Sequence, residues 1–217
     1  MELKNGVAGV EEEHKNGIKR LGDYLICSRG LLQSAVKKQG QAMKRGGKAP
    51  QIGAILRDNG DISNDELEIA LRRQRVDRLR RCPVFSMLSD SELMAISTRF
   101  TEVSVPPGAQ FIIQDEPDPT LYVLAAGKVE VYRTTLDGKH IHIADVQPPE
   151  PIGEMGYFTG GKRTASVRAL EPTELLQAQY SSLTHYFEHV PRVAHEFMRI
   201  VEQRRRATEQ ILQAQAS

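Results

Sequence analysis

The chain has 217 residues, of which 40% are apolar and 26% are charged, and its formal net charge is +1. This composition is that of an ordinary globular protein of one or two domains, and so small a net charge gives no general argument for a nucleic-acid or anionic-membrane partner. No apolar run approaches the roughly 20 residues of a membrane-spanning helix, and two isolated cysteines fit a reducing, cytoplasmic environment.

Residues 1–16 are polar, interrupted by glycine and rich in acidic side chains. They lack the apolar segment of a signal peptide, and we expect them to form a flexible tail. A small helical domain is expected over residues 17–81. It contains two degenerate repeats, which begin with related short segments at 20–26 and 52–56.

A helical pattern follows each repeat start, first at 31–44 and then from Ser63 onward. Ser63 is a plausible helix cap, because acidic residues occupy the first turn after it. The second pattern extends through 72–81. A continuous helix there would couple the N-terminal domain to the rest of the chain.

The residue pattern of the sequence changes at Cys82-Pro83, where proline ends the helical pattern. After a short helix at 89–97, β-forming residues cluster between glycine-containing turns. The expected strands lie at 110–113, 120–126, 128–135, 139–146, 164–169 and 174–180. Helices are expected at 181–189 and 192–214. We therefore predict an α+β chain in which residues 82–217 form an antiparallel β-roll, jelly-roll-like, with flanking helices.

Residues 151–169 have the composition of a phosphate-binding loop, and we call them the cassette. A ring-closed phosphate carries one negative charge, which an arginine and the amides of a helix N-terminus bind well. Gly153 allows close backbone approach before a short helix at 154–158. Glu154 can accept a hydrogen bond from a ribose hydroxyl, and Arg163 lies where it could close over the phosphate.

Gly153-Glu154 followed by Arg163-Thr164-Ala165 resembles the cassette of the cyclic-nucleotide-binding fold, found in catabolite activators, cyclic-nucleotide-dependent kinases and cyclic-nucleotide-gated channels. The resemblance covers about 83–214. It implies that Glu154 holds the ribose 2′-hydroxyl and that Arg163 pairs with the phosphate. The full set of ligand-binding residues that it implies is Gly153, Glu154, Met155, Arg163, Thr164, Ala165, Arg204 and Thr208.

The base depends on residues outside the glutamate–arginine pair. Arg-Thr at 163–164 is frequent in similar domains that prefer cyclic GMP. The final helix, however, carries Arg204 and Thr208 where catabolite activators contact adenine, so cyclic AMP is the favoured ligand and cyclic GMP the alternative. An a/d stripe through Phe197, Val201, Arg204, Thr208 and Ile211 also predicts a homodimer seam. A helix folded back on its own roll is the other interpretation.

The chain ends at Ser217, without the helix-turn-helix of catabolite-activator-like transcription factors. We therefore expect no DNA binding and no membrane partner, but signalling through a protein partner of residues 17–81. The spacing from Ile52 to Gln74 resembles the N-terminal domain of type II secretion and type IV pilus ATPases. Some of those domains bind cyclic di-GMP through repeats that begin Arg-Leu-Gly, as Arg20-Leu21-Gly22 does here.

Two other interpretations remain. The roll can be a degenerate interaction or scaffold module, with Arg163 paired to Glu154 in place of a ligand, or the chain can be a cyclic di-GMP-responsive adaptor. We expect neither an enzyme nor a metal site. No catalytic triad pattern is present, and His140 and His142, which alternate along one strand, lack an evident third ligand.

Overall fold

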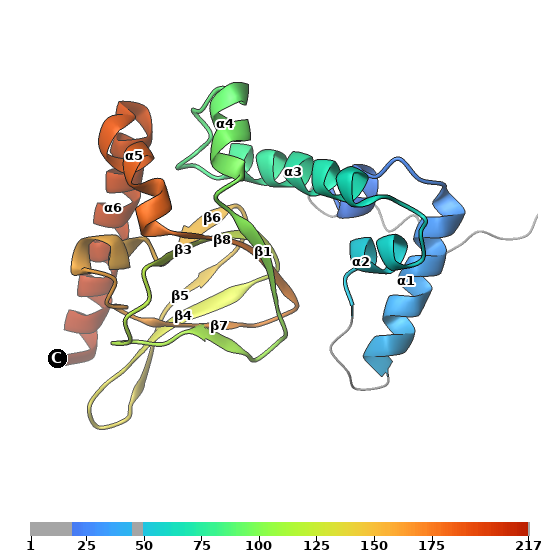
Figure 1. The fold of residues 1–217 in the computed structure, drawn as a ribbon. Helices are drawn as coiled ribbons and strands as arrows, with labels where there is room; N and C mark the ends of the chain where they lie inside the picture. Colours follow the sequence, from blue (N-terminus) through green and yellow to red (C-terminus); the bar gives the residue numbers. More distant parts are fainter. Residues whose placement is uncertain (1–18, 45–49, 217) are drawn as a thin grey trace, which may run out of the picture. The chain divides into compact units, whose positions relative to one another are not determined.

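The computed structural model describes residues 19–44 and 50–216, so the predicted tail at 1–16 lies outside the described residues. The chain divides into two compact units, Met1–Gln74 and Arg75–Ser217. The division falls inside helix α3 (Asn64–Arg81), and not after Arg81 as predicted (Figure 1). The reason is that Val76 and Leu79 are buried in the core of the second unit. In the described part of the chain, no helix is long and apolar enough to cross a membrane.

The first unit consists of a 3-10 turn η1 (Leu21–Asp23) and helices α1 (Arg29–Lys44), α2 (Ile52–Asp58) and the first part of α3. The two repeat starts have different structures, a single turn in one and a helix in the other. Gly53 packs closely on Leu67 and Leu21, so a side chain there would clash within the unit. Ser63 caps α3 as expected, accepting a hydrogen bond from the Glu66 amide at 3.2 Å.

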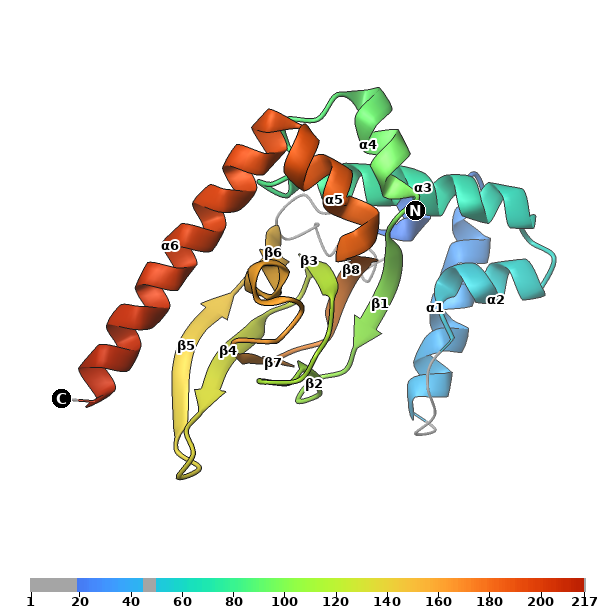
Figure 2. The same cartoon turned by 60° about the vertical axis from the view of Figure 1, so that its left-hand side comes forward.

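The second unit is the predicted antiparallel roll with flanking helices (Figures 1 and 2). Among the described residues, its strands form two four-stranded sheets of order β1-β8-β3-β6 and β2-β7-β4-β5. The strand bounds are β1 (Thr101–Val105), β2 (Gln110–Ile112), β3 (Thr120–Ala126), β4 (Val129–Thr134), β5 (His140–Val146), β6 (Glu150–Ile152), β7 (Ser166–Ala169) and β8 (Thr173–Gln179). All of the pairings are antiparallel.

Strands β1 and β6 were not predicted, and both lie at an edge of their sheet. β1 alternates polar and apolar residues weakly, and only Val105 is buried. β6 has three residues and contains Pro151, which has no amide hydrogen for a ladder and is tolerated at an edge. Edge strands carry less of the core and therefore less of the apolar pattern that makes a strand recognisable.

One apolar core lies between the sheets, around Leu124, Val129 and Leu175. A second lies between the β3–β8 side of the roll and helices α4 (Asp90–Ser97), α5 (Tyr180–His189) and α6 (Pro191–Ala216). In this second core Phe187 and Phe197 stack with ring centroids 4.1 Å apart, which fixes α5 against α6.

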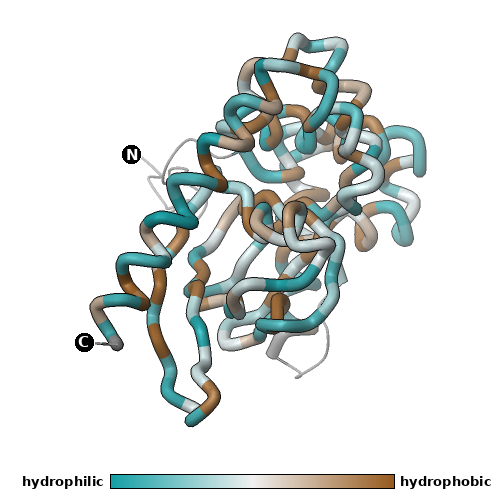
Figure 3. Tube along the Cα trace, turned by 90° about the vertical axis from the view of Figure 1, so that its left-hand side faces the viewer, coloured by the Kyte–Doolittle hydropathy of each residue, from teal (hydrophilic) through white to brown (hydrophobic). Residues whose placement is uncertain are grey.

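Helix α6 runs along the roll towards the tip of the β4–β5 hairpin (Figure 2). Its tube alternates between teal and brown, as expected for a helix with one apolar face (Figure 3). Near its end, Lys139 of the hairpin donates a hydrogen bond to the Gln215 side chain at 3.1 Å. The helix thus folds back on its own roll, and the predicted homodimer seam stays a prediction.

Candidate functional site

The cassette begins with a turn that requires glycine. Gly153 has φ +85° and precedes the 3-10 helix η2 (Glu154–Thr159), which ends at Gly160 with φ +67°. An L side chain rarely adopts such dihedrals. A Cβ atom on Gly153 would also overlap the Arg163 guanidinium. The predicted turn and short helix are therefore present, and the space above Gly153 is filled by the arginine.

The far end of the cassette is held by main-chain hydrogen bonds to the loop that precedes β3. The Asp118 amide donates to the Gly161 carbonyl at 2.9 Å, and the Arg163 amide donates to the Glu116 carbonyl at 3.0 Å. These bonds pair the two segments in an antiparallel arrangement and bring the Asp118 side chain next to that of Arg163. The Asp118 carboxylate, 45 residues from Arg163 in sequence, therefore lies within hydrogen-bond distance of it.

The Arg163 side chain is 2% exposed, and each of its five N–H groups has an acceptor in the protein. Asp118 accepts from Nε at 3.3 Å and from Nη2 at 2.7 Å, and the Thr120 carbonyl accepts from Nη2 at 2.6 Å. Nη1 donates to the Gly153 carbonyl at 3.0 Å and to the Tyr180 hydroxyl at 2.9 Å. In this conformation the guanidinium is a buried structural group that faces the loop rather than solvent.

Tyr180 connects this arginine to the first turn of α5. Its hydroxyl donates to the Gly153 carbonyl and accepts from Arg163. A Cβ atom on Gly156 would lie 2.5 Å from the same hydroxyl, so the second glycine of the cassette makes room for the phenol. Burial raises the pKa of Tyr180 to about 12, which keeps the hydroxyl neutral over the physiological range.

Glu154, the predicted ribose ligand, does not pair with Arg163. Its carboxylate is 5% exposed and lies 3.0 Å from Nη1 of Arg204 on α6. The same arginine donates to Glu150 at 2.7 Å and to the Pro151 carbonyl at 2.6 Å. Arg204 therefore clamps α6 onto the segment that leads into the cassette.

The remaining predicted residues occupy the same region with fewer contacts. Thr164 donates to the Met155 sulfur at 3.6 Å, across the cassette, and both residues are half-buried, as is Ala165. Thr208 is half-buried on α6, four residues after Arg204 and hence on the same helix face. The structure thus gathers the predicted cassette residues into one loop and brings α6 against it through Arg204.

Asp118, Tyr180 and Glu150 were not predicted to belong to the site. Tyr180 was expected only as the end of a strand, and the loop that contains Asp118 suggested no role in the site. A tyrosine in an apolar strand-to-helix junction and a carboxylate in a Pro-Asp-Pro segment are weak signals by themselves. The role of these three residues depends on the pairing of segments that are distant in sequence, and a local sequence pattern does not predict such pairing.

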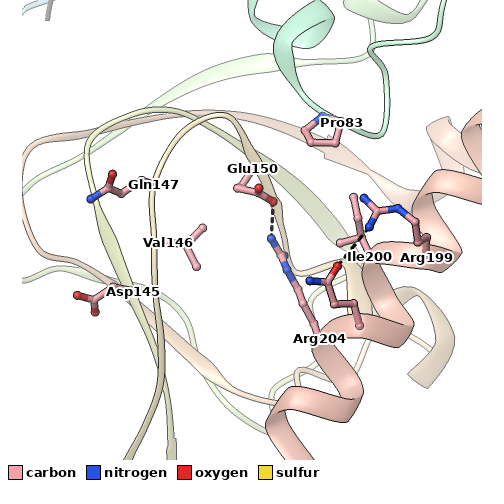
Figure 4. A pocket seen from close by; sticks show the side chains of 9 residues that line it. Pro83, Asp145, Val146, Gln147, Glu150, Arg199, Ile200 and Arg204 are labelled. Atoms are coloured by element: carbon pink, nitrogen blue, oxygen red, sulfur yellow. Dashed lines mark hydrogen bonds and ion pairs between the residues drawn. The ribbon is translucent and has the colours of Figure 1, made fainter. Parts of the chain in front are cut away.

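A pocket of about 340 Å³ lies beside the cassette, between α6, Pro83 and the β5–β6 turn (Figure 4). Arg204 and Glu150 line this pocket and also take part in the contacts between α6 and the start of the cassette. Arg163 and Thr164 do not line the pocket. Its polar lining is Asp145, Gln147, Glu150, Arg199, Gln203 and Arg204. The two carboxylates balance the two arginines, so this lining has no net positive charge to favour a cyclic phosphate.

His140 and His142 form a separate cluster around Glu130. One carboxylate oxygen of Glu130 contacts His140 Nε2 at 3.0 Å and His142 Nδ1 at 3.2 Å, and Arg168 donates to the other oxygen. In the described residues, no group of three or more His, Cys, Asp or Glu side chains has a geometry that could hold a metal ion.

Comparison with known proteins shows what the roll and its cassette are similar to. Residues 102–189 match the family model described as the cyclic nucleotide-binding domain. The cyclic AMP receptor protein of Thermus thermophilus is 31% identical over 128 residues, which cover 59% of this chain and 59% of that protein. The crystal structure of the Thermus thermophilus catabolite activator protein superposes with a TM-score of 0.54 at 30% identity, covering 62% of this chain and 63% of that one.

Another relative is the acetyltransferase Pat of Mycolicibacterium smegmatis, which is 30% identical over 102 residues, or 47% of this chain and 30% of the relative. The match covers less than a third of the acetyltransferase, and the family model that this chain matches describes a cyclic nucleotide-binding domain. The chain spans 59% of the length of the cyclic AMP receptor protein and 58% of that of a cAMP-activated transcriptional regulator from Mycobacterium tuberculosis. The resemblance of the N-terminal unit to secretion and pilus ATPases has no support in these comparisons.

Proposed function

We propose that this protein is a receptor for a cyclic nucleotide, with cyclic AMP favoured over cyclic GMP, on the premise that residues 102–189 match the cyclic nucleotide-binding domain family. The observation that carries the proposal is the presence of Glu154 and Arg163 at the two ends of one glycine-bounded loop. Both side chains are buried and held by partners, Arg204 for one and Asp118 for the other. A carboxylate and a guanidinium at the two ends of such a loop fit a ribose hydroxyl and a cyclic phosphate.

The preference for cyclic AMP is supported by the names and the sequence of the relatives. Two of the curated relatives are named as a cyclic AMP receptor protein and as a cAMP-activated transcriptional regulator, at 31% and 25% identity. Thr208 lies on the α6 face that carries Arg204, which contacts Glu154 in the cassette. A base that extends from a sugar held by Glu154 would therefore lie against this helix, within reach of a threonine hydroxyl.

Binding is tested by calorimetric titration of the full chain with cyclic AMP, cyclic GMP and cyclic di-GMP. We expect cyclic AMP to bind most tightly. Arg163→Lys keeps the charge but removes the planar fork, and should weaken binding at least about 100-fold. Arg168→Lys, the same change at an exposed position of β7, should leave affinity unchanged. No heat with any of the three ligands would overturn the proposal.

We propose further that the bound nucleotide acts through protein contacts of residues 17–81, as a receptor without direct DNA binding. Helix α3 is continuous, and it contributes Leu67 and Ala70 to the core of the first unit and Val76 and Leu79 to that of the second. A change in the second unit therefore reaches the first through one helix. Hydrogen exchange in residues 19–44 and 50–74 should change when cyclic AMP is added, and exchange confined to the roll would exclude this output.

A second candidate function is an interaction module that binds no nucleotide. It is favoured by the complete internal pairing of Arg163, which leaves no guanidinium N–H for a ligand in this conformation. In that case none of the nucleotides would raise the melting temperature, and Arg163→Lys would lower it. The cyclic di-GMP adaptor is distinguished by the third titration, because Arg20→Ala would then remove binding of cyclic di-GMP alone.

A further inference from the structure

If the protein has the function proposed above, a cyclic phosphate must gain access to the buried Arg163 side chain. All five N–H groups of that side chain are used inside the protein. A phosphate can therefore be bound by Arg163 only in exchange for one of the present acceptors. The acceptor that is lost most readily decides how the site opens.

The acceptors differ in strength. All five bonds have a charged donor, but Asp118, which accepts two of them, also carries the opposite charge, so its bonds are the strongest of the set. The Gly153 and Thr120 carbonyls belong to the main chain and are fixed by the fold. The Tyr180 hydroxyl is neutral and is the weakest acceptor of the set.

The Tyr180 hydroxyl also has a second bond that does not depend on the arginine. It donates to the Gly153 carbonyl, so the phenol stays anchored when the guanidinium turns away. An anionic phosphate oxygen is a stronger acceptor for a guanidinium N–H than a phenol oxygen. The planar guanidinium turns as a unit, so the exchange replaces the phenol by the phosphate as the acceptor of one Nη1–H, while the Asp118 carboxylate stays its neighbouring counter-charge.

We propose that Tyr180 is a competing acceptor that holds Arg163 in the withdrawn, buried position and thereby sets the affinity of the site for a cyclic nucleotide. The hydrogen bond from Arg163 to Tyr180 exists only in the ligand-free state. The bond from Tyr180 to Gly153 exists in both states and cancels in the comparison. Removing the hydroxyl therefore destabilises the free protein more than the complex.

The test is Tyr180→Phe, which keeps the ring and its packing in the aromatic cluster with Tyr157. We expect Phe at this position to tighten cyclic AMP binding by about ten-fold, because the free protein then holds a buried donor without an acceptor. The melting temperature should fall without ligand, and the rise produced by saturating cyclic AMP should exceed that of the wild-type chain. Equal or weaker affinity in the variant would overturn the inference.

Tyr157→Phe is the matched control. It removes a hydroxyl from the same cluster, but that hydroxyl donates to Glu188 at 2.9 Å and does not contact Arg163. We expect its affinity to equal that of the wild type. The outcomes separate the two proposals: a wild-type chain that binds while Tyr180→Phe binds no tighter overturns only the role of Tyr180, whereas no binding by either protein overturns both.

Discussion

Arg204 on α6 lies 3.0 Å from the buried carboxylate of Glu154, and this contact joins the last helix to the cassette. The arginine also contacts Glu150 and the Pro151 carbonyl, so its guanidinium holds one side of the helix to strand β6 and the turn after it. The residue proposed to recognise the sugar is thus in direct contact with the helix proposed to contact the base. We therefore expect a sugar bound at Glu154 to affect the contact between Arg204 of α6 and the cassette.

Arg204→Ala should loosen α6. The change leaves the Glu154 carboxylate buried without its cation, and hydrogen bonds to charged groups contribute roughly 1.5–3 kcal/mol each. We expect a comparable loss of unfolding free energy and faster amide exchange in the last third of α6. Arg205→Ala is the control, because the exposed Arg205 pairs with Glu202 and Glu209 on its own helix, and it should leave stability nearly unchanged. Equal effects of the two variants would contradict the clamp.

Glu154→Gln tests the sugar contact without relying on the loss of binding alone. Wild-type affinity should fall about ten-fold when cyclic AMP is replaced by its 2′-deoxy analogue, because the carboxylate loses the hydroxyl that it accepts from. In Glu154→Gln the two ligands should bind nearly equally. Glu150→Gln, which also removes a partner of Arg204 but lies before the cassette, should keep the wild-type discrimination. A double-mutant cycle over protein and ligand isolates the contact.

Much of the roll was predictable because its signals are local. Strand β3 begins and ends where the sequence predicts, and helices α4 and α6 agree within a few residues. The alternation of apolar and polar residues, turn glycines and helix caps each depend on a few neighbouring residues, so they can be recognised without knowledge of the fold. The cassette was found for the same reason, since Gly153, Glu154 and Arg163 lie within one loop.

What the sequence did not reveal is where the arginine points. Arg163 was expected to close over a phosphate or to pair with Glu154, and it instead bonds Asp118, 45 residues before it, and Tyr180, 17 residues after it. Those partners are placed by antiparallel pairing of distant segments. The short edge strands β1 and β6 were not predicted for a related reason. Their stability comes from pairing with the neighbouring strand and little from their own side chains.

Gly153→Ala should separate backbone strain from site disruption. Gly153 and Gly138 have nearly the same φ, +85° and +81°. A Cβ atom meets nothing within 4 Å at Gly138, but it overlaps the Arg163 guanidinium at Gly153. Gly138→Ala should therefore cost only the strain of a left-handed alanine, about 1–2 kcal/mol, and preserve ligand binding. Gly153→Ala should lower the melting temperature further and abolish binding, and similar melting temperatures for the two variants would contradict the close packing seen here.

Glu130 provides a pH-dependent contribution that is separate from the ligand site. Burial acts to raise its pKa, but hydrogen bonds from His140, His142 and Arg168 outweigh burial and lower the pKa to about 2. An unfolded glutamate has a pKa of about 4.3. Because the folded pKa is the lower of the two, folding favours the ionised carboxylate. The stabilisation is complete above about pH 4.3 and is lost as pH falls towards 2.

Glu130→Gln removes this titration and should flatten the acid limb of the stability curve. We expect the melting temperature of the wild-type chain to fall between pH 5 and pH 3 more steeply than that of Glu130→Gln, with the two curves converging at the acid end. Glu171→Gln removes a carboxylate from an exposed turn residue and should follow the wild-type curve. Other carboxylates titrate in all three proteins, so the difference between the curves, and not the slope of any one, measures Glu130. Parallel curves for wild type and Glu130→Gln would show that the contacts with His140, His142 and Arg168 do not stabilise the folded carboxylate.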